Sequence, residues 1–377
     1  MNALSNLLKL PLTIWEANRL QPEHDTLTHL RSVADWLIRS QDAHDNGGSA
    51  KSFNLLTNRW EPSYPETTGY IIGTFLDLGE FWQNDLYIKR AERMGEWLQS
   101  LQLQNGAFPS FDLSTPVVFD TGQILHGLVD LTERLGTTAY QQAVERAAAW
   151  LTDIQDPSGA WTHGAYLNTA HTYSTRVAWA LLRAGRLLNE TRFQTAAIRN
   201  VKWALTQQEP NGWFRQNSLK DQDRPILHTI VYAARGLFEI GRLVNHEGYQ
   251  LAARRPMDVL LDIWKTERRL FGAYDAHWRG VAASRCLVGE AQLSGLWFRM
   301  ATVWNDRPYA EAAVEVNRRL KQVHHLAGTH LGVRGGLAGS YPVQGRYCFL
   351  KYPNWASKFL ADTFLLEAQF SQNLKGK

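Results

Sequence analysis

The chain has 377 residues, of which 44% are hydrophobic and 20% are charged, so it can bury the core of one large domain or two ordinary ones. Its net charge is only +4, and no long basic run accompanies it, which argues against a nucleic-acid partner. Two cysteines, Cys286 and Cys348, cannot form a disulfide framework or a paired-cysteine zinc site. Neither a metal nor a cofactor is therefore expected.

No apolar run reaches the roughly 18 residues that a membrane span needs. The N-terminal stretch also lacks the basic region and the cleavage site of a secretory signal. A cytoplasmic protein is the expectation.

In chain order, the first predicted helices belong to a repeat. Segments 33–48, 94–108, 147–161 and 200–214 each place a Trp five residues before a Gln. The pairs are Trp36/Gln41, Trp97/Gln102, Trp150/Gln155 and Trp203/Gln208, and in the last three a Gly follows the Gln by four residues, at Gly106, Gly159 and Gly212. Each segment has the pattern of a helix that ends at a glycine-containing turn.

A second predicted helix follows each turn. These segments carry small residues and the apolar spacing of helices that are buried on both sides; they are 66–81, 120–135, 173–188, 228–244, 289–304 and 353–368. Six helical hairpins predict one all-α domain over 1–377, an (α/α)6 toroid with the Trp–Gln helices outside and these helices inside. The expected repeats are 30–82, 83–135, 136–188, 189–244, 245–304 and 305–368.

The Q-x-x-x-G-x-W-like repeat resembles that of the α/α toroids, which include terpene cyclases, prenyltransferase β subunits and six-hairpin glycosidases. The stretches YPETTGYI, FDTGQIL, HTIVYAARGL, GEAQLS and YPNWASKF are more closely similar to VpsJ-type proteins of bacterial exopolysaccharide gene clusters. This resemblance covers roughly residues 30–366 and implies a role in polysaccharide biosynthesis or processing. The acidic D-x-D-D cluster that terpene cyclisation needs does not occur in the sequence.

In such a toroid the loops that enter the inner helices open at one end of the barrel, where polar and aromatic residues from distant repeats converge. The candidate substrate-binding residues are Trp60, Tyr64, Gln123, Arg176, Tyr232, Trp278, Arg285, Gln292, Arg346, Tyr352, Asn354, Trp355 and Lys358. Aromatic walls with a few convergent polar groups are typical of a ligand pocket.

Glu66 and Asp120 begin neighbouring inner helices at corresponding places. Two carboxyl groups that face one pocket suit glycoside hydrolysis, with one as proton donor and the other as base or nucleophile. The competing interpretation is that each acid only complements the positive N-terminal end of its helix.

A second hypothesis is uronyl C5-epimerisation or β-elimination. Tyr173 and His228 would then move protons, while Arg176 or Arg285 neutralises the substrate carboxylate. A third hypothesis is a glycan-binding or scaffold protein without catalysis. The expected partner is an oligosaccharide or polysaccharide, with an anionic or lipid-linked substrate left open.

Overall fold

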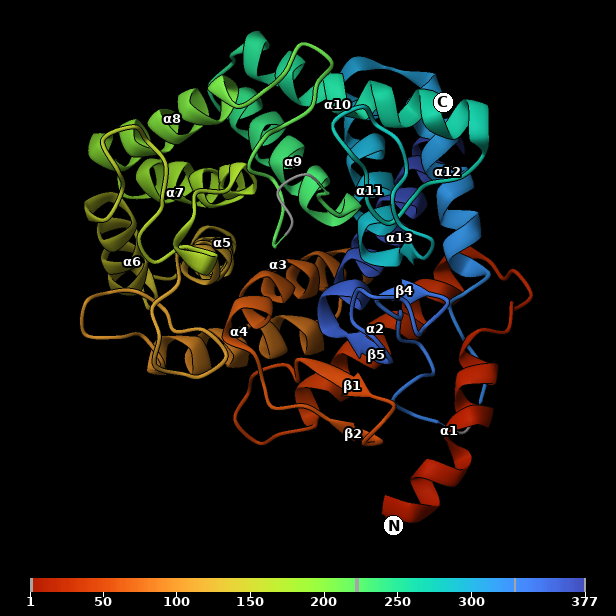
Figure 1. Cartoon of the computed structure of the whole chain (residues 1–377). Coiled ribbons are helices and arrows are strands. Elements are labelled where there is room, and N and C mark those ends of the chain that lie inside the picture. The colour runs from red at the N-terminus through yellow and green to blue at the C-terminus, as the bar shows by residue number, and fades with distance from the viewer. Residues whose placement is uncertain (1–2, 221–223, 329, 376–377) are drawn as a thin grey trace.

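The computed structural model describes residues 3–220, 224–328 and 330–375. Within these ranges, helices form two concentric rings of six, and the chain runs round the rings in sequence order (Figure 1). The inner ring comprises α3 (Pro65–Trp82), α5 (Val118–Leu135), α7 (Thr175–Leu187), α9 (Leu227–Leu243), α11 (Leu287–Trp304) and α13 (Asn354–Lys375). The outer ring comprises α2 (Thr26–Asp42), α4 (Asp85–Ser100), α6 (Gln141–Asp153), α8 (Thr191–Thr206), α10 (Glu247–Glu267) and α12 (Arg307–Lys321). The predicted all-α toroid is confirmed.

The two rings differ in how their helices are buried. Outer helices are amphipathic: in α4, the buried side chains Ala91, Met94 and Leu98 follow one helical stripe. Inner helices pack against two inner neighbours and an outer helix, so burial extends around most of their circumference, as in α9 and α11. This difference explains why the inner segments lack a clear polar face in the sequence.

The glutamine of each repeat joins its own turn to the next outer helix. Its Nε2 donates one hydrogen bond to the carbonyl of the turn glycine and another to a carbonyl in that helix, at 2.7–3.4 Å. The acceptors are Gly47 and Arg90 for Gln41, Gly106 and Ala143 for Gln102, Gly159 and Ala196 for Gln155, and Gly212 and Ala252 for Gln208. The repeat therefore encodes the spacing between consecutive outer helices.

The turn itself requires glycine. Gly159 has a φ of +93°, and a Cβ added there would lie 2.4 Å from the carbonyl oxygen of Arg199 on α8. Both the left-handed backbone and the close approach exclude a side chain.

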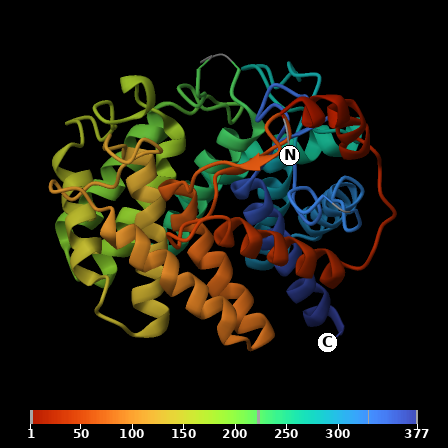
Figure 2. The same ribbon diagram turned by 90° about the horizontal axis from the view of Figure 1, so that it is seen from below.

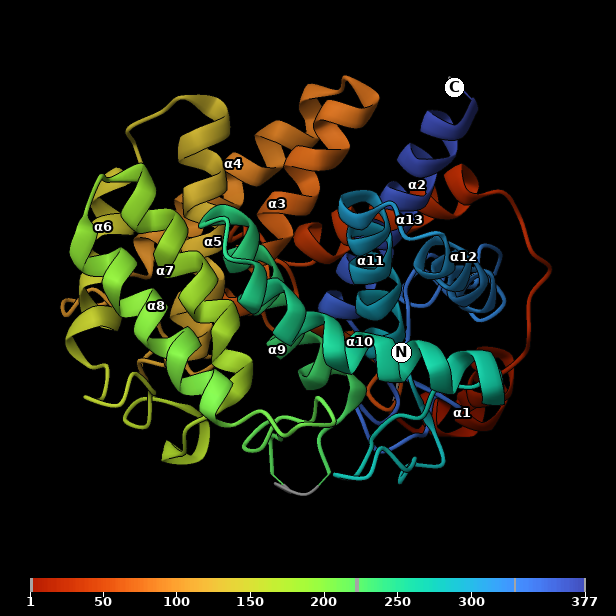
Figure 3. The same cartoon turned by 90° about the horizontal axis from the view of Figure 1, so that it is seen from above.

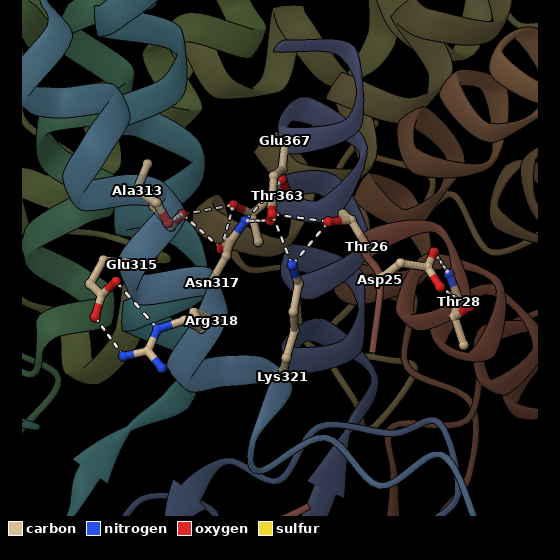
Figure 4. Close-up of polar contacts among 11 residues, drawn as sticks. Asp25, Thr26, Thr28, Ala313, Glu315, Asn317, Arg318, Lys321, Thr363 and Glu367 are labelled. Atoms are coloured by element: carbon tan, nitrogen blue, oxygen red, sulfur yellow. Dashed lines mark hydrogen bonds and ion pairs between the residues drawn. The ribbon is translucent and has the colours of Figure 1, made fainter. Parts of the chain in front are cut away.

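The ring closes where α2 packs against α13. Figure 4 shows the polar contacts at this junction: Lys321 of α12 donates to Glu367 of α13 at 2.8 Å and to the Thr26 hydroxyl of α2 at 2.9 Å. Asn317 donates to the other Glu367 oxygen at 2.7 Å. One carboxylate thus ties the last helices of the ring to the first.

The connections at the two ends of the barrel differ in length. Short turns follow the inner helices, whereas long loops lead into them, and these loops gather at one end of the barrel (Figures 2 and 3). Two small antiparallel sheets stiffen the loops: β2 (Arg59–Trp60), β1 (Ser52–Asn54) and β5 (Lys351–Pro353) form one, and β3 (Arg285–Cys286) and β4 (Ser340–Tyr341) form the other. The sequence did not predict these strands.

One further helix, α1 (Ala3–Ala17), lies beside the loop end of the barrel, outside the two rings (Figure 3). None of the described helices is both long and apolar enough to cross a membrane.

We expect Gln155→Leu to lower the free energy of unfolding by roughly 1–3 kcal/mol, because it removes two donated hydrogen bonds and leaves the Gly159 carbonyl with one donor fewer. Urea unfolding followed by circular dichroism measures this change. Gln142→Leu, at an exposed site on α6, the helix that ends just before Gln155, is the matched control and should change stability by less than about 0.5 kcal/mol. Equal effects in the two variants would contradict the proposed bridging role.

Candidate active site

A cavity of about 440 Å³ opens at the loop end of the barrel, over the N-terminal ends of the inner helices. Its wall combines the two predicted carboxyl groups with a majority of aromatic and apolar side chains. The lining residues are Lys51, Tyr64, Glu66, Thr67, Tyr70, Ser110, Phe111, Val117, Phe119, Asp120, Tyr166, Tyr173, Leu219, His228, Thr229, Tyr232, Tyr347 and Trp355.

Glu66 and Asp120 are brought together by the close packing of α3 and α5. Each lies in the first turn of its helix, and Pro65 fixes the start of α3. Glycines allow the two helix backbones to approach: a Cβ on Gly69 would lie 2.5 Å from the Ile124 Cα. The two acids that the sequence placed at corresponding helix starts therefore line the same cavity.

Tyr64 connects the two carboxyl groups. Its hydroxyl donates to Asp120 Oδ2 at 3.1 Å. Tyr64 also interacts with Glu66, and this interaction lowers the pKa of that acid. One phenol therefore influences both carboxyl groups.

Burial raises the pKa values of both acids above those of ordinary carboxyl groups. It raises the pKa of Glu66 to about 7, against opposing effects from the Tyr64 hydrogen bond and from the charges of Lys51 and Arg176. Burial also raises the pKa of Asp120 well above its usual range, and the neighbouring Glu66 charge raises it further. At neutral pH the pair therefore holds a proton.

Tyr173 and His228 also line the cavity. His228 Nδ1 lies 2.7 Å from Gln292 Oε1, which can only accept, so Nδ1 carries the proton and Nε2 is left as an acceptor. Burial lowers the pKa of His228 to about 3, so the ring is neutral. Burial raises the pKa of Tyr173, which keeps its phenol protonated.

Several lining residues were not predicted as site residues. They come mostly from the loops, where no periodic pattern marks them; they are Lys51, Ser110, Phe111, Phe119, Tyr166 and Tyr347. Lys51 is the one lysine or arginine among the described lining residues, and its ammonium group lies 4.1 Å from the centre of the Phe111 ring. The only advance signal for Lys51 was its position in the loop before Glu66.

The cavity contains Tyr64, Glu66, Asp120, Tyr173, His228, Tyr232 and Trp355 of the predicted set, and the other members lie elsewhere. Arg176, Gln292 and Lys358 line a different cavity deeper in the barrel. Arg285 and Arg346 line a neighbouring groove, and Arg285 pairs with Glu290 at 2.5 Å.

The remaining predicted residues serve packing and support. Gln123 is buried and accepts a hydrogen bond from Arg176 at 2.6 Å. Trp60 packs on Trp36, Trp278 packs on Trp213, Tyr352 is buried, and buried Asn354 donates to Ser49. Aromatic and amide side chains occur in the core and in the loops as well as in the cavity. The sequence alone could not distinguish these locations.

The neighbouring groove extends the site along the loops. It has a volume of about 780 Å³ and shares Tyr166, Leu219 and Tyr347 with the cavity. The two spaces therefore adjoin at these three side chains.

No protein-family model matches the sequence, and no curated protein matches it either. Solved structures do match its fold. An unsaturated glucuronyl hydrolase specific for heparin is 16% identical and has a TM-score of 0.72, over 91% of this chain and 97% of that one. The cellobiose 2-epimerase of Spirochaeta thermophila is 14% identical with a TM-score of 0.72, over 98% of both chains. A family 76 glycoside hydrolase from Bacteroides thetaiotaomicron is 12% identical with a TM-score of 0.64, over 92% of this chain and 78% of that one.

At these identities the similarity establishes the fold, an α/α toroid of the six-hairpin glycosidase-like kind. The reaction has to be inferred from the site.

The raised pKa of Glu66 makes the stability of the protein depend on pH. The unfolded chain releases this proton near 4.5 and the folded protein near 7, so the folded state is favoured below 4.5 and loses that advantage as the pH rises to 7. Relative to Glu66→Gln, the wild type should lose up to roughly 3 kcal/mol across this window, and Asp120 acts in the same direction.

Urea unfolding at a series of pH values measures the difference. Glu247→Gln, in the exposed first turn of α10, is the matched control and should follow the wild type. Parallel curves for the wild type and Glu66→Gln would contradict the raised pKa.

Proposed function

We propose that this protein is a carbohydrate-active enzyme that cleaves a glycosidic bond, with Glu66 and Asp120 as the catalytic pair. The observation that carries the proposal is the arrangement of two neighbouring carboxyl groups with raised pKa values in an aromatic cavity. Helix complementarity alone would not favour burial of both acids against each other, because burial and repulsion oppose ionisation.

The difference between the two environments assigns the roles. Burial and the Glu66 charge both oppose ionisation of Asp120, which would donate its proton to the glycosidic oxygen as the bond breaks. Glu66 ionises near pH 7, is stabilised by Lys51 and Arg176, and would act as nucleophile or base at the anomeric carbon.

The remaining cavity wall suits a sugar with an acidic group. Tyr173, Phe111 and Trp355 offer ring faces for the apolar side of a pyranose, and Lys51 offers a cation for a carboxylate. The fold likeness to hydrolases described as acting on unsaturated glucuronyl groups supports a uronic acid as that sugar. The sequence resemblance supports exopolysaccharide biosynthesis as the setting, with an anionic or lipid-linked oligosaccharide as substrate.

A second candidate is epimerisation or elimination. Its specific support is the neutral His228, whose Nδ1–H is fixed by Gln292 and whose Nε2 is left to accept a proton, opposite the phenol of Tyr173. The low pKa of His228 makes it a weak base, and Arg176 lies outside this cavity's lining. Both points favour hydrolysis as the first candidate.

We expect Asp120→Asn to lower kcat by about 10²–10⁴-fold, because the variant has no acidic proton for the leaving oxygen. Asp85→Asn, an exposed acid in the first turn of outer helix α4, is the matched control and should retain activity. In the wild type, activity should rise as Glu66 ionises near pH 7 and fall where Asp120 loses its proton.

The measurement is an NMR time course in heavy water with an unsaturated glucuronyl disaccharide and with an oligosaccharide that contains a saturated, 4-linked glucuronic acid, which retains the C5 proton that epimerisation and elimination require. New reducing ends that are lost in Asp120→Asn support hydrolysis. Deuterium incorporated into an uncleaved sugar would replace this proposal with epimerisation, and a new unsaturated product would replace it with elimination. Binding of these sugars without any chemical change would favour the non-catalytic reading.

A further inference from the structure

A different cavity, of about 270 Å³, lies between the inner helices towards their C-terminal ends. Tyr70 and Tyr232 line both this cavity and the active-site cavity, so the two lie back to back across these rings. The deeper cavity reaches solvent at the short-turn end, where the side chain of Asp77 is 42% exposed. In Figures 2 and 3 the end of the barrel with the short turns lies opposite the end with the long loops.

Charged side chains dominate the lining of this cavity. Its cations are Arg134, Arg176, Arg183, Arg235, Arg299 and Lys358, and its acids are Asp77, Asp130, Glu239 and Asp362. Each acid pairs with one cation: Asp77 with Arg134 at 2.7 Å, Asp130 with Arg183 at 2.8 Å, Glu239 with Arg235 at 2.8 Å, and Asp362 with Lys358. Two guanidinium groups, those of Arg176 and Arg299, form no ion pair with a carboxylate among the described residues, although the charge of Arg299 acts on Glu239 and lowers its pKa.

Rim residues do not supply the missing partners. Glu80 pairs with Arg134 and Glu133 pairs with Arg183, while Arg242 adds a cation beside Glu239. None of these three lines the cavity. The excess positive charge therefore belongs to the interior of the cavity.

Arg176 and Arg299, the two arginines of this lining without an ion-pair partner in the described ranges, have different contacts. Arg176 donates through Nε to Gln123, and its guanidinium carbon lies 5.0 Å from the centre of the Tyr232 ring. Arg299 has a buried Nε without a hydrogen-bond partner among the described residues, and so does its neighbour Arg235. Burial and the like charge of Arg299 lower the pKa of Arg235 to about 9. Adjacent guanidinium groups with unused donors are unfavourable until an anion compensates them.

We propose that this cavity binds a phosphate group, held by Arg299 and Arg235 with Arg176 at its inner end. Two unmatched cations balance a dianion better than a singly charged carboxylate, and the planar guanidinium fork matches phosphate oxygens in bidentate fashion. The space is many times the 10–15 Å³ that one water molecule requires, so a sugar attached to the phosphate also fits the volume. The site is spatially distinct from the proposed cleavage site, because Tyr70 and Tyr232 lie between the two cavities, while Arg176 acts electrostatically on Glu66 from the deeper one.

Isothermal titration of the full chain at low ionic strength tests the proposal, with inorganic phosphate and glucose 1-phosphate as separate probes. The wild type should bind one equivalent of phosphate, and Arg299→Gln should weaken binding at least 10-fold. Arg307→Gln, at an exposed arginine that pairs with Glu311 on outer helix α12, is the matched control and should bind as the wild type does. Equal affinities for the two probes would identify inorganic phosphate as sufficient, and tighter binding of glucose 1-phosphate would identify a sugar phosphate.

Absence of saturable binding of either probe to the wild type would overturn the proposal, even if Arg299→Gln does not fold. Unchanged affinity in a folded Arg299→Gln would also overturn it. Lys51→Gln distinguishes the two cavities: phosphate binding that is lost in this variant belongs to the active-site cavity and contradicts the assignment. Loss of glycosidase activity has no bearing on these results, so failure of the proposed function and failure of the phosphate site are separable.

Discussion

The architecture depends on one side-chain amide that is used repeatedly. In four consecutive repeats a glutamine satisfies its own turn carbonyl and a carbonyl of the next outer helix, so each turn is fastened to the helix that follows it round the ring. Because the turns are fixed in this way, the loops that follow them all enter the inner ring from the same end. The convergence of Glu66, Asp120, Tyr173 and His228 on one cavity is a consequence of that order.

The sequence could reveal the features that recur. The Trp–Gln spacing located four of the six outer helices, and the corresponding positions of Glu66 and Asp120 placed them at neighbouring helix starts. It could not reveal Lys51 or Tyr347, because loop conformation depends on tertiary contacts such as the pairing of β1 with β5. It also could not fix depth along the barrel: Arg176 and Lys358 lie only one turn further along their helices than the mouth residues, yet they line the other cavity.

The two acids illustrate how environment separates chemically similar groups. Asp120 is 4% exposed and its pKa is raised by the Glu66 charge, whereas the pKa of Glu66 is lowered by the charges of Lys51 and Arg176. Both acids lie in the first turn of an inner helix, so a loop residue and a side chain beneath the cavity contribute to the difference. Arg176 thus acts on both cavities. Its charge lowers the pKa of Glu66 from below, and its guanidinium group is one of the two in the deeper cavity that form no ion pair within the described part of the chain.

The closure of the ring has a consequence for synthesis of the chain. Helix α2 packs on α13, whose first residue is about 300 positions further along, and the junction needs Lys321 and Glu367 as well. At roughly 5–20 residues per second, a ribosome takes on the order of 15–60 s to make the intervening chain. During that interval Leu30, Val33 and Leu37 have no inner partner to cover them. Until α13 is made, the nascent toroid is an incomplete ring that exposes the apolar face of α2. We expect a chaperone to bind the nascent chain at this face.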